Sequence, residues 1–214
     1  MRVDELAQRL AACRMTELAT ALAMDPQVSD VWRAYPDPQS YVALVEDHRR
    51  PVSIRFAAAL MLRSAEQSQL PRADPHMVAQ VFATALQQNL AGYAFSWGWL
   101  WAPGDSLGSL GRVFVEIGRP AEHALEPLLE DPTPLDTYLG RDQAIPMARR
   151  QYRVKDFAAF YLARISSVDL PWEPDLARRD EAIARLRSRL ALTRPAAVPA
   201  GSPGGATSFQ LGGS

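Results

Sequence analysis

Apolar residues recur along this chain at three- and four-residue intervals, separated by short polar and proline-containing segments. Between Arg119 and Ile165 the pattern occurs twice, as one stripe from Ala121 to Leu129 and a broader one from Val154 to Ile165. Such spacing places apolar side chains on one face of a helix. Two short helices with broad apolar faces cannot bury themselves alone. We therefore expect a helical hairpin that neighbouring elements cover.

The same spacing predicts further helices on both sides of this hairpin. They cover residues 3–24, 28–35, 39–47, 51–67, 76–90, 107–117 and 175–192. Between Phe56 and Leu62 the sequence is apolar nearly all round, which is typical of a helix covered from several directions.

Capping residues support several of these boundaries. Pro51 opens one helix, and Asp74 followed by Pro75 resembles a cap with proline in the first turn. We expect Gly118 to end a helix as a C-cap glycine and Asp175 to cap the last one. The segment 36–38 is predicted to be a turn.

The helical period fails from Tyr93 to Trp101, where every odd position is aromatic. Period two is typical of an extended segment, and a helix end with aromatics pointing in several directions is the alternative. These rings either fill the core where two helical pairs meet imperfectly, or line a binding surface, since Trp and Tyr are favoured at binding hot spots. We name Trp97, Trp99 and Trp101 as candidate binding residues.

An internal similarity links the segments Ile54–Leu62 and Val154–Leu162. Each has an apolar and then a basic residue, two alanines, and two large apolar residues at identical spacing. This pattern resembles the second helix of a HEAT repeat, with Arg55 and Lys155 in the basic position. In that family helical hairpins stack into a right-handed solenoid, and a proline often kinks the first helix.

Pro127 fits the place of that proline. It removes the hydrogen bond to the His123 carbonyl, which costs roughly 3 kcal/mol in a regular helix and so indicates a kink. The resemblance implies an all-α fold, a short α-solenoid of stacked helical hairpins over residues 1–192; an irregular helical bundle is the alternative. Residues 193–214 are mostly Pro, Ala, Gly and Ser, which predicts a disordered tail.

Bulk composition narrows the classes of partner. The chain has 214 residues, a formal net charge of -1 and a pI near 6.3, so no whole-molecule field attracts nucleic acid, and we do not expect it as a partner. No apolar run reaches the roughly 18 residues that a membrane span needs. The N-terminus lacks the apolar region of a signal peptide, and we expect a cytoplasmic protein.

Motifs for catalysis or metal binding are not recognisable in the sequence. His48, His76 and His123 have no metal-ligand spacing, and the glycines near 104–111 do not form a phosphate loop. The acids between Glu126 and Asp136 are interpreted as a solvated helix face and loop. We therefore name no catalytic residue, metal or cofactor.

Two groups of basic residues have competing interpretations. The last helix carries Arg178, Arg179, Arg185, Arg187 and Arg189, with Arg194 just beyond, and a second group contains Arg149, Arg150, Arg153 and Lys155. Each is either a solvated helix face or a patch for a ligand, which for the last helix means phosphate or an acidic protein. We name Arg55, Arg153 and Lys155 as further candidate binding residues.

These features favour a non-enzymatic protein–protein interaction module, a scaffold or adaptor with an unknown protein partner. The alternatives are a HEAT-like enzyme, of the alkylpurine DNA glycosylase or the chromophore lyase type, and a structural subunit of a larger assembly. A glycosylase needs aromatic residues beside an acid on a basic face. The aromatic run and Asp105 loosely match that need, but the pI argues against it.

Overall fold

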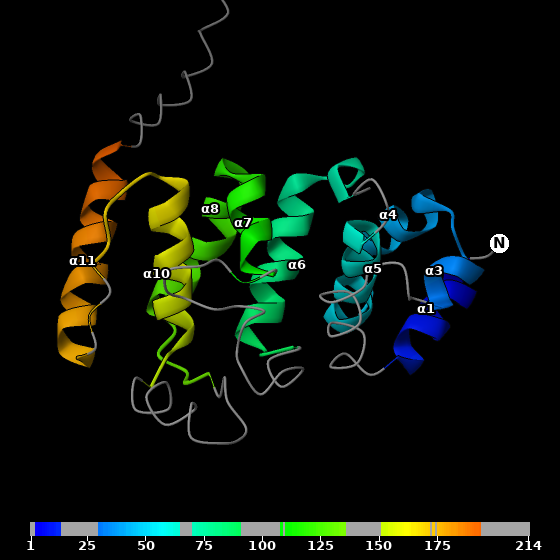
Figure 1. The fold of residues 1–214 in the computed structure, drawn as a ribbon, viewed down its shortest axis with the longest axis horizontal. Coiled ribbons are helices and arrows are strands. Elements are labelled where there is room, and N and C mark those ends of the chain that lie inside the picture. The colour runs from blue at the N-terminus through cyan, green and yellow to red at the C-terminus, as the bar shows by residue number, and fades with distance from the viewer. Residues whose placement is uncertain are drawn as a thin grey trace, which may run out of the picture.

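The computed structural model describes residues 3–13, 30–64, 70–90, 108, 110–135, 151–171, 173 and 175–193. This part of the chain is helical (Figure 1), which confirms the all-α prediction. It contains no named strand, and one isolated antiparallel bridge joins Pro134 to Arg153. None of the helices in the described ranges is long and apolar enough to cross a membrane.

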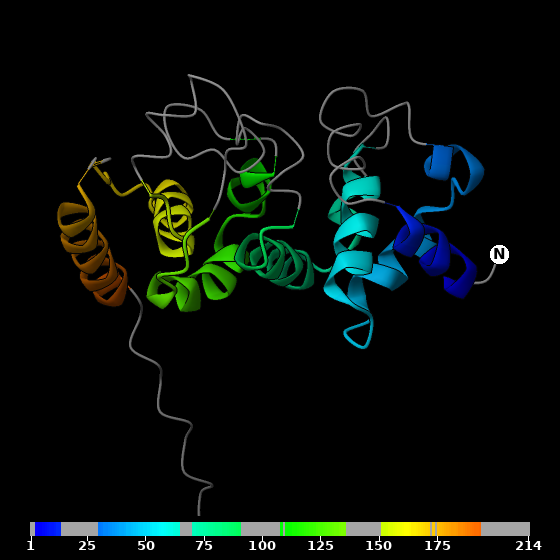
Figure 2. The ribbon, with the colours of Figure 1, turned by 90° about the horizontal axis from the view of Figure 1, so that it is seen from below.

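The helices follow one another along the long axis of the molecule, from α1 at one end to α11 at the other (Figure 1). They are α1 (Val3–Ala12), α3 (Asp30–Ala34), α4 (Pro38–Glu46), α5 (Val52–Ser64), η2 (Leu70–Arg72), α6 (Pro75–Gln87), α7 (Gly111–Ile117), α8 (Arg119–Leu125), η3 (Glu126–Glu130), α10 (Val154–Ile165) and α11 (Leu176–Thr193). Figure 2 shows α6 and α8 in one layer and α7 and α10 in another.

Each helix packs mainly against helices that are close to it in the chain. Contacts join α4 to α5, α5 to α6, α6 to α7 and α8, and α10 to α11. The helices α8 and η3 pack against α10, as the two apolar stripes between Arg119 and Ile165 predict. In α5 every residue from Phe56 to Leu62 is buried, which confirms the expectation from its all-round apolarity.

Aromatic rings form a continuous series through the core. The ring centroids lie 5.2 Å apart for Phe56 and Phe82, 6.2 Å for Phe82 and Phe114, and 5.0 Å for Phe114 and Tyr161. The series crosses from α5 through α6 and α7 to α10. Gly111 allows the last step, since a Cβ at this position would collide with the Tyr161 ring.

Capping side chains fix several helix starts. Asp74 accepts a hydrogen bond from the amide of His76 with Pro75 in the first turn, as predicted. Asp37 and Pro38 form the same signature, so α4 begins at Pro38 and the predicted turn at 36–38 is its cap. A hydrogen bond from the Ser40 hydroxyl lowers the pKa of Asp37. Asp175 accepts from the amide of Arg178, as expected for the cap of α11.

The chain changes direction and helix type around residues 118–130. Gly118 has φ 72 and separates α7 from α8, which confirms the predicted C-cap glycine. The helix α8 ends at Leu125, with a last α-helical hydrogen bond from the Glu126 amide to the Glu122 carbonyl, and the chain continues as the 3-10 helix η3, which contains Pro127. A proline cannot donate the next α-helical bond, and a 3-10 turn accommodates that loss. The predicted kink therefore takes the form of a change in helix type.

Several predictions concern residues that lie outside the described ranges. They are the second half of the helix predicted for 3–24, the aromatic run Tyr93–Trp101, and the tail after Thr193. The last helix ends at Thr193, next to the boundary proposed at 192 and 193.

Candidate functional site

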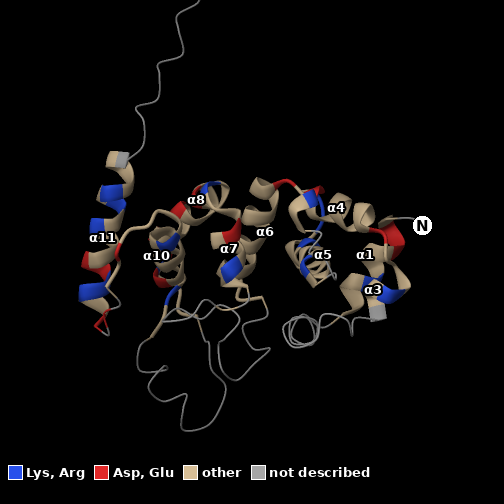
Figure 3. Ribbon diagram, turned by 45° about the horizontal axis from the view of Figure 1, so that its top comes forward, with Lys and Arg blue, Asp and Glu red and all other residues tan. Residues whose placement is uncertain are grey.

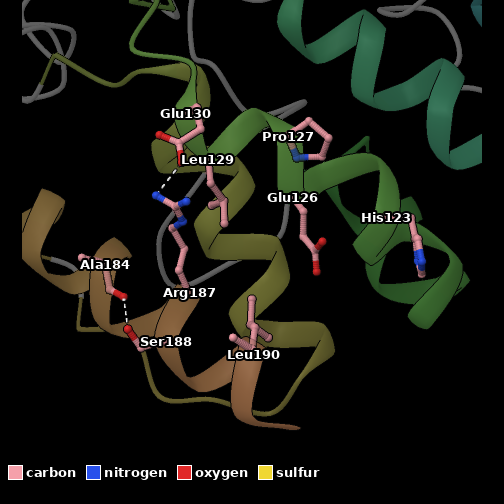
Figure 4. A pocket seen from close by; sticks show the side chains of 10 residues that line it. His123, Glu126, Pro127, Leu129, Glu130, Ala184, Arg187, Ser188 and Leu190 are labelled. Atoms are coloured by element: carbon pink, nitrogen blue, oxygen red, sulfur yellow. Dashed lines mark hydrogen bonds and ion pairs between the residues drawn. The ribbon is translucent and has the colours of Figure 1, made fainter. Parts of the chain in front are cut away.

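A surface groove of about 730 Å³ lies where α8 and η3 face α11 (Figure 4). It is lined by His123, Glu126, Pro127, Leu129, Glu130, Ala184, Arg187, Ser188, Leu190 and Ala191. One wall comes from the end of α8 and from η3, and the opposite wall from the last three turns of α11.

The groove combines apolar and charged groups. Leu129 and Leu190 are buried and contribute apolar surface from the two walls. Nη1 of Arg187 lies 2.5 Å from Oε1 of Glu130, so this pair spans the groove (Figure 4). Both side chains are more than half exposed, at 53% and 65%, so the pair adds little stability. Apolar contacts inside a charged rim are typical of surfaces that bind other proteins.

The charge network that attaches α11 to α10 holds the second wall in place. The Asp156 carboxylate is 0% exposed, and its Oδ2 accepts a hydrogen bond of 2.7 Å from Nη1 of Arg179 in α11. The same oxygen accepts from the backbone amide of Arg153 at 2.9 Å. The guanidinium of Arg179 also lies 5.4 Å from the centre of the Tyr152 ring. Asp156 thus joins the start of α10 to the first turn of α11.

Asp180 forms the outer half of the network. Its carboxylate lies 2.8 Å from Nη2 of Arg153 and 2.8 Å from Nζ of Lys155. Burial alone would raise the pKa of Asp180, but the hydrogen bonds from Arg153 and Lys155 outweigh it and lower the pKa. Burial alone would lower the pKa of Arg153, but its hydrogen bonds to Asp156 and Asp180 outweigh this effect and raise the pKa. The ionised forms of Asp180 and Arg153 are therefore favoured.

The predicted binding residues occupy separate places. Arg153 and Lys155 meet at Asp180, so their charges are engaged inside the chain. Arg55 lies in α5, where it is 8% exposed and donates from Nε to the Val45 carbonyl at 2.9 Å. Burial lowers the pKa of Arg55. Arg55 therefore contacts the last turn of α4.

The three tryptophans Trp97, Trp99 and Trp101 lie outside the described residues, as do Asp105, Arg149 and Arg150. The glycosylase-type alternative depends on that aromatic run and on Asp105. His76 and His123 come together on α6 and α8 with ring centroids 6.4 Å apart. Within the described ranges, no group of three or more His, Cys, Asp or Glu side chains is arranged to hold a metal ion.

Sequence reasoning missed the groove and the role of Asp156. A partial signal existed, since Arg179 shares the stripe of Ile183, Leu186 and Leu190 at i, i+4, i+7 and i+11. A charged residue on an apolar stripe needs a buried partner. Asp156, an acid inside the apolar stripe of residues 154–165, is the residue that the same argument selects.

Comparison with models of known protein families gives no match, and comparisons with curated proteins and with solved structures give no significant match.

Proposed function

We propose that this protein is a non-enzymatic protein–protein interaction module built as a short α-solenoid of HEAT-like hairpins. The hairpins are α4 with α5, α6 with α7, and α8–η3 with α10, and α11 follows them. Three features support the proposal: the sequential contacts between helices, the layers in Figure 2, and the position of Pro127 in the first helix of the third hairpin.

The observation that carries the proposed function is the groove between η3 and α11. Leu129 and Leu190 offer apolar contact, and Glu130 and Arg187 offer charges that orient a ligand. Its volume of about 730 Å³ is sufficient for several side chains of a bound segment. We propose that a segment of the partner protein lies in this groove between the two walls.

Site-specific photo-cross-linking tests this function. A photoreactive amino acid at Ser188, inside the groove, is compared with the same residue at Gln80, an exposed position on α6 outside it. We expect a cross-linked protein from position 188 and not from position 80.

A pair of matched variants controls for the groove itself. Ala184→Trp fills the groove from the wall formed by α11, whereas Ala177→Trp places the same ring on the same helix outside it. Ala184→Trp should abolish the cross-link, and Ala177→Trp should preserve it. The proposal fails if both positions give the same cross-links, or if Ala184→Trp leaves them unchanged.

A further inference from the structure

The outer face of α11 carries a row of arginines separate from the groove. Arg178, Arg185 and Arg189 are spaced i, i+7 and i+11, so they lie within roughly 20° of one line along the helix, at intervals of about 10 Å and 6 Å. All three are exposed, while Ile183 and Leu186 on the adjoining face of the helix are buried. We call Arg178, Arg185 and Arg189 the arginine row.

The positive charge of this row is largely uncompensated by nearby groups. Arg185 lies 3.8 Å from Glu181, and both side chains are well exposed. Among the described residues, the guanidinium groups of Arg178 and Arg189 have no ion-pair partner. The arginine row therefore differs from Arg153 and Arg179, whose charges Asp156 takes up. Figure 3 shows basic positions along α11.

An exposed leucine extends the row at the end of the helix. Leu192 is 84% exposed and lies three residues after Arg189, on the same side of α11. Among the described residues, Leu192 is the only large hydrophobic side chain that is exposed. The surface thus offers guanidinium groups followed by an apolar contact.

We propose that the arginine row and Leu192 bind an acidic segment of a partner protein, with carboxylates toward the arginines and an apolar residue toward Leu192. A guanidinium donates paired hydrogen bonds that match a carboxylate, which makes arginine suited to this contact. The row lies outside the groove, so this site does not depend on groove binding.

Charge and surface composition favour a protein over other anionic partners. A membrane-binding helix inserts a broad apolar face, but the apolar face of α11 is buried against α10. Nucleic-acid binding relies on many phosphate contacts, and a chain with net charge -1 that also places Glu181 beside Arg185 provides few. An acidic polypeptide needs only the local row.

Fluorescence anisotropy with a labelled peptide of repeated Glu-Glu-Leu triplets tests the proposal, against a Gln-Gln-Leu peptide of the same length. The triple variant Arg178→Gln, Arg185→Gln, Arg189→Gln removes the row. The control Arg72→Gln, Arg112→Gln, Arg119→Gln removes the same charge from exposed positions elsewhere. Because every changed residue is exposed, we expect both variants to fold, and circular dichroism checks this.

We expect the acidic peptide to bind more tightly than its glutamine counterpart, with affinity falling as salt rises. The row variant should lose on the order of tenfold in affinity, and the control variant should resemble wild type. Leu192→Ala should also weaken binding, whereas Ala184→Trp in the groove should have no effect. Because Ala184→Trp fills only the groove, peptide binding that survives this change occurs at the arginine row and not in the groove.

Three results would overturn the proposal. One is that wild type does not bind the acidic peptide at low salt. Another is that the row and control variants lose affinity equally, which would mean attraction by overall charge alone. The third is tighter binding to phosphatidylserine vesicles or to a DNA oligonucleotide than to the peptide, with the same dependence on the arginine row.

Discussion

At the scale of single residues, Asp156 is the ionised side chain whose loss should reduce the stability of the fold most. Its fully buried carboxylate accepts hydrogen bonds from Arg153 and from Arg179, which is 4% exposed. A buried ion pair adds little by itself, because desolvation offsets the attraction, but removing one partner leaves the other buried and unpaired. The network is therefore a point of vulnerability.

Asp156→Asn should lower the free energy of unfolding by about 3–5 kcal/mol, because Arg179 would keep its buried charge without a carboxylate. Chemical denaturation measures the change. Glu181→Gln removes one partner of an exposed pair and should have almost no effect. Equal losses of unfolding free energy in the two variants would show that the buried Asp156 network stabilises the fold no more than an exposed ion pair does.

The lowered pKa of Asp180 gives a pH dependence with a definite sign. A carboxylate whose folded pKa lies below 3.8 stabilises the fold above that value, and this contribution is lost as the pH falls through the folded pKa. Wild type should therefore lose stability in acid below about pH 4. Asp180→Asn should be less stable at neutral pH and show a shallower acid decline in thermal unfolding. An unchanged acid decline in the variant would contradict this assignment.

Gly111 has a purely steric role. Gly111→Ala would place a methyl group against the Tyr161 ring, which is fully buried. We expect a loss of about 1–3 kcal/mol in unfolding free energy. Thermal or urea denaturation checks it, with the exposed Ser188→Ala as control. Wild-type stability in Gly111→Ala would mean that α7 and α10 can separate at little cost.

At the scale of elements, α11 packs mainly against α10. It packs against α10 through Ile183, Leu186 and Leu190, besides the charge network. The helix has an apolar inner stripe, a wall of the groove, and the arginine row. Its position therefore controls both proposed binding surfaces.

Leu186→Ala should loosen α11 before the rest of the molecule. Leu186 is 1% exposed, and its truncation costs about 2–5 kcal/mol, which weakens the attachment to α10. Hydrogen exchange should rise in α11 and remain low in α5. Leu192→Ala, at a position 84% exposed, should leave exchange unchanged. Uniform exchange along all helices in Leu186→Ala would mean that the fold unfolds as one unit.

Local patterns predicted the elements better than the contacts between them. All-round apolarity identified Phe56–Leu62 as buried, and the Asp74–Pro75 signature placed the start of α6. Asp37 and Pro38 carry the same signature, but the preceding proline favoured a turn. The contact of Asp156 with Arg179 spans 23 residues, so it depends on how α11 docks and not on local spacing.

At the scale of the whole molecule, helices contact mainly their neighbours in the series. The rings from Phe56 to Tyr161 connect four helices by steps of 5.0 to 6.2 Å. In the proposed solenoid, stability is approximately a sum over neighbouring interfaces, so the ends open more easily than the middle. The groove between η3 and α11 lies at one of these ends, and its two walls come from helices that are far apart in the sequence. No sequence pattern marks it, since it arises from their packing.

The ion pair that spans the groove makes the two proposed surfaces of α11 respond differently to ionic strength. A ligand that enters the groove must separate Glu130 from Arg187, and salt screening of this exposed pair makes that separation easier. The same screening weakens the attraction between the arginine row and an acidic segment. One helix would then favour the row at low salt and the groove at higher salt.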